Sequence, residues 1–232
     1  MTQGRHYTRM AILGIVIGLC ILFLGLAGEQ IYHRLLSSKC AKQYTQTHDV
    51  AVLAEGFYHI TSCIEVGEDI PQKMLYYTKE LIDCGEWNTY YAESKYGKKY
   101  GSIENPELAM KFTYLQLTLL YNEPTRYLEA FTQYYPTMDI SERMAYIGMF
   151  ASEDFIQHKD WQQMYDTIVQ GYISLSEKES SLLEKSRIYT ELASFCDSVQ
   201  QPNDANNYMT QANEYRGKIG DGPLIGIQGD GS

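Results

Sequence analysis

The feature that most constrains this chain is an uninterrupted apolar stretch near its amino terminus, Met10–Ala27, with the sequence MAILGIVIGLCILFLGLA. As an α-helix with a rise of about 1.5 Å per residue, it would be about 27 Å long, close to the ~30 Å apolar core of a bilayer. No later stretch of the sequence is comparable. We therefore expect a short tail at residues 1–9, one membrane-spanning helix at residues 10–28, and a remainder that faces water.

The same stretch could instead be a signal peptide that is cleaved after Ala27. Arg5 and Arg9 precede it, and small residues end it, as in secretory signals. However, the run exceeds the roughly 7–15 apolar residues of a typical signal. We therefore favour a retained signal anchor and keep cleavage as the alternative.

The flanking charges bear on orientation. Arg5 and Arg9 lie close to the membrane on one side, and Arg34, Lys39 and Lys42 follow on the other. This count does not decide by the positive-inside rule alone. Because the first tail is so short, we expect a single-pass protein with a cytoplasmic amino terminus and an extracytoplasmic bulk.

The rest of the chain is acidic and rich in tyrosine. The whole chain has 29 acidic and 19 basic residues, and only Arg5 and Arg9 precede the apolar stretch, which leaves a net charge of −12 after it. Such a surface repels phosphate backbones, so a nucleic-acid partner is not expected. The 44% apolar content and the 21 tyrosines indicate a folded chain with many half-polar packing surfaces.

From Gln30 to about Gly217, the apolar spacing predicts helix after helix with short turns and no sustained strand alternation. A helical run is expected over 42–64, and others follow breaks at Pro71, at Pro106 and at Asp139, where Glu142 completes a capping box. Short connections favour antiparallel neighbours, so the fold class is all-α, built from helical hairpins.

The chain divides by composition into successive regions. Residues 29–104 contain helical hairpins and end in a Tyr- and Lys-rich segment, 86–101, expected to be one short helix and a loop. Residues 105–219 contain the more regular hairpins. Residues 220–232 are Gly-rich and are expected to form a flexible tail.

The last hairpin, 186–219, has the 34-residue length of a tetratricopeptide unit and resembles that family position by position. The large and small packing residues that carry the resemblance are Tyr189, Leu192, Ala193, Cys196, Ala205, Met209 and Ala212. A looser match carries Ala151, Ser152, Phe155, Met164, Ile168 and Gly171. The weakest match carries Tyr114, Leu117, Tyr121, Ala130 and Tyr134. An irregular helical bundle is the alternative, because any packed hairpin needs such residues.

The resemblance implies a right-handed stack of hairpins whose first helices line a concave face. Members of the family mostly bind peptides or proteins there. Mapped onto this chain, the expected partner-binding residues are Arg187, Thr190, Ser194, Asp197, Tyr146, Met149, Glu153 and Ile156.

Few residues suggest a metal site, a catalytic site or a disulfide. His59 and Cys63 lie one helical turn apart and could begin a metal site, but two more ligands would have to come from Cys40, Cys84 or the 86–101 segment. A catalytic cysteine, Cys84 or Cys196, would need a nearby histidine. Cys40, Cys63, Cys84 and Cys196 could form two disulfides in an oxidising compartment, or the last three could be small core residues. We expect no metal, no cofactor and no catalytic residue.

These observations favour a non-enzymatic scaffold that is anchored in a membrane and binds other proteins near a membrane complex. One alternative is an irregular α-helical enzyme or ligand-binding domain that uses the 86–101 segment. Another is a structural subunit of a membrane assembly.

Overall fold

The computed structural model describes residues 25, 27–63 and 69–220, so nearly all of the expected membrane helix and of the Gly-rich tail lies outside the described residues. Within these ranges no helix combines the length and the apolar character that a membrane crossing requires. The chain forms two compact units that divide between Tyr114 and Leu115. The expected boundary at 104/105 lies before this division, which falls inside a helix.

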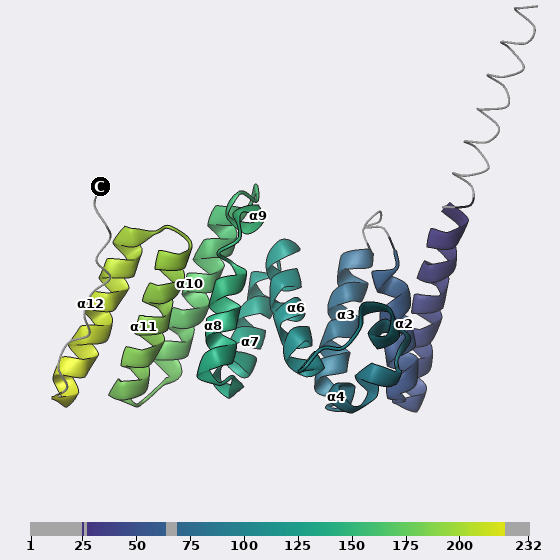
Figure 1. The fold of residues 1–232 in the computed structure, drawn as a ribbon, viewed down its shortest axis with the longest axis horizontal. Helices are drawn as coiled ribbons and strands as arrows, with labels where there is room; N and C mark the ends of the chain where they lie inside the picture. Colours follow the sequence, from purple (N-terminus) through teal and green to yellow (C-terminus); the bar gives the residue numbers. More distant parts are fainter. Residues whose placement is uncertain (1–24, 26, 64–68, 221–232) are drawn as a thin grey trace, which may run out of the picture. The chain divides into compact units, whose positions relative to one another are not determined.

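The all-α fold class is confirmed, since the described residues contain helices and no strand (Figure 1). Unit 1 contains helix 27–47, α2 (Val50–Thr61), α3 (Ile70–Asp83), α4 (Trp87–Tyr90), the 3-10 helix η1 (Tyr91–Glu93), α5 (Lys95–Tyr100) and most of α6 (Pro106–Leu120). Unit 2 contains the end of α6, α7 (Pro124–Tyr134), the 3-10 helix η2 (Tyr135–Thr137), α8 (Ile140–Met149), α9 (Glu153–Ile156), α10 (Trp161–Lys178), α11 (Leu182–Ser198) and α12 (Pro202–Ile219).

In unit 1, the prediction of one helical run over 42–64 is wrong, because the chain turns at His48. His48 has a φ of +51°, in the left-handed region, where helix 27–47 stops. Asp49 then caps α2, since its side chain accepts a hydrogen bond of 2.9 Å from the Ala51 N–H. The apolar spacing alone does not show this break.

The core of unit 1 depends on a close approach among helix 27–47, α2 and α3. The buried Tyr77 of α3 donates its hydroxyl to the Ser37 carbonyl, at 2.5 Å. A Cβ added at Gly56 would lie only 2.3 Å from the Tyr77 hydroxyl oxygen. Glycine at this position therefore lets the tyrosine pass α2 and reach helix 27–47.

The segment 86–101 is not a helix followed by a loop, as expected, but three short helical turns, α4, η1 and α5. The Trp87 side chain is fully buried, and the Ser94 hydroxyl caps α5 by accepting from the Gly97 N–H at 2.9 Å. A Cβ at Gly97 would meet the Tyr91 carbonyl oxygen at 2.1 Å. Helical turns this short give no regular spacing of apolar residues in the sequence, because each is too short to show a helical period.

In unit 2, the last two helices match the predicted hairpin, with α11 beginning earlier than expected, at Leu182, and α12 beginning at Pro202. The predicted capping box at Asp139 and Glu142 is confirmed at the start of α8. α10 runs from Trp161 to Lys178. Helix α7 packs on α10, and α11 packs on α10, α12 and α8.

The core of unit 2 is a cluster of buried aromatic rings. The hydroxyls of Tyr127 and Tyr146 are hydrogen-bonded, with their oxygens 2.5 Å apart. The hydroxyls of Tyr135 and Tyr172 are hydrogen-bonded as well, at 2.9 Å. Burial raises the pKa of all four phenols, so they stay neutral and can donate. The Phe131 ring stacks on Tyr135, with centroids 4.5 Å apart. The many tyrosines therefore serve the interior, with each hydroxyl of these two pairs satisfied by another.

Candidate interaction face

A buried ion pair fixes α8 against α11. Arg143 Nη1 lies 3.2 Å from Glu191 Oε1, and the two side chains are only 6% and 7% exposed. The remaining guanidinium N–H groups donate to the carbonyls of Met138, at 3.0 Å, and Pro136, at 3.3 Å. The Tyr135 hydroxyl donates to Glu191 Oε2 at 3.0 Å. Each charge thus has hydrogen-bond partners in addition to the opposite charge, as a buried pair requires.

A second contact sets the relative direction of the two helices. The rings of Phe150 and Phe195 have centroids 6.1 Å apart, one or two turns beyond the Arg143–Glu191 pair on each helix. The later residue of α8 thus meets the later residue of α11, so the two helices lie side by side and run parallel. This is the relation that corresponding helices of successive hairpins have in a repeat stack.

The outer side of α8 is apolar or small. Ile140 is 69% exposed and Met144 is 45% exposed. Ala145 and Gly148 are also exposed, and a Cβ at Gly148 would meet nothing within 4 Å. The stripe carries no charged group at these four positions, which is unusual for the outer side of a helix in an acidic chain.

The outer side of α11 begins with Leu183, which is 51% exposed. Arg187 follows one turn later, with its Nη2 2.6 Å from Glu184 Oε2. The hydroxyls of Thr190 and Ser194 donate back to carbonyls of their own helix, at 2.9 and 3.0 Å. These two residues therefore present their methyl and methylene groups more than free donors.

The two stripes join into one surface. Glu191 Oε1 lies 3.7 Å from Arg187 Nε and 3.2 Å from Arg143 Nη1, so the exposed Arg187 borders the junction between the helices. On α8, Ile140 and Met144 flank Arg143 along the helix. We call this surface the α8–α11 face, and it comprises Ile140, Met144, Ala145, Gly148, Leu183, Arg187, Thr190, Ser194 and Asp197.

Only some of the expected partner-binding residues lie on this face. Arg187, Thr190, Ser194 and the exposed Asp197 form the α11 stripe of the face. Tyr146 is a correction: it is fully buried, and its hydroxyl is paired with Tyr127, so it cannot contact a partner.

The other three expected residues lie at or beyond the end of α8. Met149 is half-buried near that end, and Ile156 is half-buried in α9. Glu153 begins α9, and its side chain is outside the described residues.

Sequence reasoning missed Ile140, Met144 and Leu183. The buried residues Arg143, Ile147 and Phe150 occupy one side of α8, which leaves Ile140 and Met144 at its outer edge. The sequence has no local signal for this, because the side that is buried includes an arginine.

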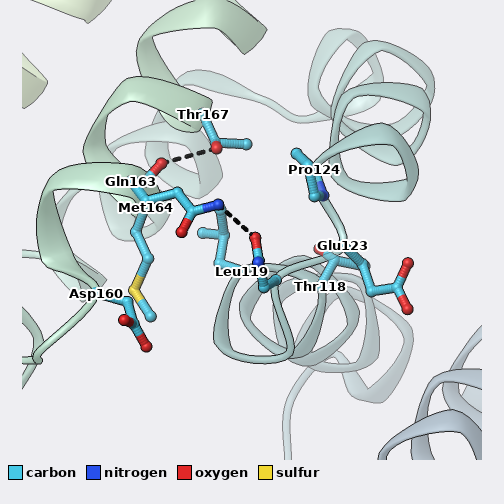
Figure 2. Close-up of a pocket in the computed structure, with 9 residues that line it drawn as sticks. Thr118, Leu119, Glu123, Pro124, Asp160, Gln163, Met164 and Thr167 are labelled. Atoms are coloured by element: carbon cyan, nitrogen blue, oxygen red, sulfur yellow. Dashed lines mark hydrogen bonds between the residues drawn. The ribbon is translucent and has the colours of Figure 1, made fainter.

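A small pocket lies elsewhere in unit 2, where the α6–α7 turn meets α10 (Figure 2). Asn122 adopts a φ of +56° in this turn, and its side-chain oxygen accepts a hydrogen bond of 2.6 Å from Gln163 Nε2. The lining residues are Thr118, Leu119, Asn122, Glu123, Pro124, Asp160, Gln163, Met164 and Thr167. Its ionisable groups are the two carboxylates Glu123 and Asp160, and no nucleophilic thiol or imidazole lines it.

His59 and Cys63, which we considered as the start of a metal site, do not point toward a common position. The Cys63 thiol faces its own helix and lies 3.5 Å from the His59 carbonyl oxygen, while both His59 ring nitrogens contact other side chains, His33 and Glu55. Among residues 25–63 and 69–220, no cluster of three His, Cys, Asp or Glu residues could hold a metal ion.

The four cysteines that the structure describes are free thiols. Cys196 is fully buried, as the core interpretation expected, whereas Cys40, Cys63 and Cys84 are half-buried. Burial raises the pKa of the Cys196 thiol to about 11, and its polar neighbour is the Tyr165 hydroxyl, at 3.3 Å. A thiol in this environment is a poor nucleophile.

Comparisons of this chain with protein-family models, with curated proteins and with solved structures found no match. The case for a function therefore depends on the geometry of the chain itself.

Proposed function

We propose that this chain is a membrane-anchored, tetratricopeptide-like scaffold that binds a partner protein on its α8–α11 face. The observation that carries the proposal is the exposure of Ile140, Met144 and Leu183 on two helices that pack against each other, in a chain that is otherwise strongly acidic. Covering a large aliphatic side chain completely contributes about 1.5–3 kcal/mol. Three such side chains can thus supply much of the affinity of a transient interface.

The polar residues of the face suit a role in orientation. Arg187 and Asp197 lie on the exposed α11 stripe, at the border of the apolar patch. Charged groups at the rim of an interface affect the rate and selectivity of association more than its affinity. An amphipathic helix or extended peptide with an acidic residue opposite Arg187 would fit this arrangement.

The membrane anchor in this proposal comes from the sequence at 10–28, and the adjoining helix supports it. Ile31, Tyr32 and Leu35 are exposed on one side of helix 27–47, directly after the apolar stretch. Aromatic and aliphatic side chains at such a position suit the boundary between lipid and water. In the proposed orientation the amino terminus is cytoplasmic and both units are extracytoplasmic.

Photocrosslinking tests the face. A benzophenone amino acid replaces Met144 in the full-length protein in its native membranes, and a matched probe replaces the exposed Asn206 of α12. We expect a discrete crosslinked product from position 144, its loss when Ile140→Ser and Leu183→Ser are added, and no such product from position 206. Equal products from both positions, or a product that survives the two serine substitutions, would refute the face.

Membrane attachment is tested separately. Carbonate extraction should leave the full-length chain in the membrane pellet, and a chain that starts at Gly28 should move to the supernatant. Protease added outside intact cells should shorten the chain if the bulk is extracytoplasmic. Release of the full-length chain by carbonate would refute the anchor and would leave the proposed interaction face untested and unaffected.

A further inference from the structure

Two histidines from different helices of unit 1 meet in the interior. His33 of helix 27–47 and His59 of α2 bring their Nδ1 atoms to 2.8 Å. His59 is buried, and the His33 side chain is only slightly exposed. On its other ring nitrogen, His59 Nε2 lies 3.1 Å from Glu55 Oε1. The contact links the helix nearest the expected membrane segment to the rest of the unit.

The neighbours assign the protons in this contact. Burial raises the pKa of the Glu55 carboxyl, but the hydrogen bond and charge of Lys95 outweigh it, so the net shift is downward and the carboxylate stays ionised. An ionised carboxylate only accepts, so His59 must carry a proton on Nε2. Neutral His59 then offers a lone pair on Nδ1, and His33 must donate its Nδ1–H to it.

This arrangement tolerates one extra proton but not two. The first can bind His33 Nε2, which lies 4.0 Å from Glu29 Oε1, and the Nδ1–H···Nδ1 bond persists. The second must bind His59 Nδ1, which removes the only acceptor and places two N–H groups against each other. Two adjacent imidazolium ions also repel each other in a poorly hydrated site.

The charged and titratable groups around the pair come from three elements. Helix 27–47 contributes Glu29 and Tyr32, α2 contributes Glu55 and Tyr58, and α5 contributes Lys95. Glu55 favours a proton on His59, whereas Lys95 and His33 oppose it, and burial opposes it most, so the pKa of His59 is lowered. Neither Lys95 nor ionised Glu55 can replace the lost Nδ1 acceptor.

We propose that the His33–His59 pair is an acid-sensitive contact that releases the first part of helix 27–47 from α2 when both imidazoles are protonated. Release should stop before Ser37, because the Tyr77 hydroxyl holds the Ser37 carbonyl at 2.5 Å and does not titrate near neutral pH. Asp69, which pairs with Arg34 and Lys73, also keeps its charge, since these partners lower its pKa.

A proton fits the gap between the rings better than a metal ion. A separation of 2.8 Å is that of an N–H···N hydrogen bond. Two imidazole nitrogens bound to tetrahedral zinc at about 2.0–2.1 Å would lie about 3.3 Å apart. The rings would have to separate before they could hold such an ion.

Hydrogen exchange of the full-length protein in detergent micelles, measured from pH 7.5 to 5.0 and corrected for the intrinsic pH dependence, tests the proposal. Below about pH 6.5, the opening constant of residues 29–36 should rise by up to tenfold per pH unit, as uptake of one proton requires. Residues 37–47 should change much less. The control His48→Asn removes an exposed histidine from the adjacent turn and should behave like the wild type.

The variant His33→Phe should weaken the pH dependence only in part, because it removes the opposing N–H and the like charge while burial still lowers the pKa of His59. If this variant does not fold, nuclear magnetic resonance of labelled histidines in the wild type still decides: the His59 ring should take up its proton at a lower pH than an ordinary imidazole, over the range in which the opening constant rises. A pH-independent exchange rate in the wild type, protonation of the His59 ring in the range of an ordinary imidazole, or a zinc-dependent loss of exchange at micromolar zinc would each overturn the proposal.

Discussion

Removing one member of the Arg143–Glu191 pair should destabilise unit 2 far more than removing both. In Arg143→Met, Glu191 keeps the Tyr135 hydroxyl but loses its buried counter-ion, and Arg187 is the nearest remaining cation, at 3.7 Å. An uncompensated buried charge costs about 3–5 kcal/mol. We therefore expect the free energy of unfolding of unit 2 to fall by about 3–4 kcal/mol.

The double variant Arg143→Met/Glu191→Met replaces the ion pair with apolar side chains of similar volume. The Tyr135 hydroxyl still has Tyr172, at 2.9 Å, but the two carbonyls that accepted from Arg143 lose their donor. We expect a loss of about 1–3 kcal/mol, less than the sum of the single losses. The coupling energy should thus be about 3 kcal/mol or more.

Tryptophan fluorescence can follow unit 2 alone. The chain has two tryptophans, Trp87 in unit 1 and the half-buried Trp161 in unit 2, so a Trp87→Phe background leaves one reporter. Urea unfolding of Arg143→Met, Glu191→Met and the double variant in this background yields the double-mutant cycle. The exposed pair Lys159–Asp160 of unit 2 is the matched control, and Lys159→Met should cost at most about 0.5 kcal/mol. A loss below about 1 kcal/mol for Arg143→Met, or strictly additive losses, would refute this account of the α8–α11 junction.

Further predictions concern packing and reactivity. Gly56→Ala should lower the unfolding free energy of unit 1 by more than about 2 kcal/mol, because its Cβ would displace the Tyr77 hydroxyl, whereas Gly148→Ala should be neutral or stabilise unit 2 by up to about 1 kcal/mol, both by urea unfolding. Tyr165→Phe should cost about 1–2 kcal/mol in the same assay, since it removes a 2.5 Å hydrogen bond to Asp204. Cys196 should resist a thiol reagent at pH 8 in the folded protein, with a pKa of about 11, and should react at the rate of unfolding; rapid labelling would contradict its burial.

Much of the helical architecture could be predicted from local signals. Pro71, Pro106, and Asp139 with Glu142 mark helix starts in the structure at or beside the expected residues. Each acts through backbone geometry or a cap that involves neighbours within one turn. The turn at His48 was missed, because a non-glycine residue in the left-handed region has no clear sequence signature.

The candidate site could be predicted only in part. Arg187, Thr190, Ser194 and Asp197 were expected from the resemblance to the tetratricopeptide family, which needs only the phase of one helix, whereas Leu183 on the same helix was not. Ile140 and Met144 were missed because their exposure depends on which side of α8 meets α11, and Arg143 and Glu191 fix that side across 48 positions of the sequence. A buried arginine has no local signal that distinguishes it from an exposed one.

The same long-range pairs limit what unit 2 can do chemically. Glu191 is occupied by Arg143 and Tyr135, and the Tyr165 hydroxyl is occupied by Asp204 and Cys196. These ionisable or nucleophilic groups are therefore used to hold helices together, with their lone pairs and protons engaged. On α8, the exposed residues Ile140, Met144, Ala145 and Gly148 are apolar or small, so this part of the surface can act by contact with another molecule. The binding role that we propose for the α8–α11 face therefore rests on where the chain places its reactive groups as much as on where it leaves its apolar ones.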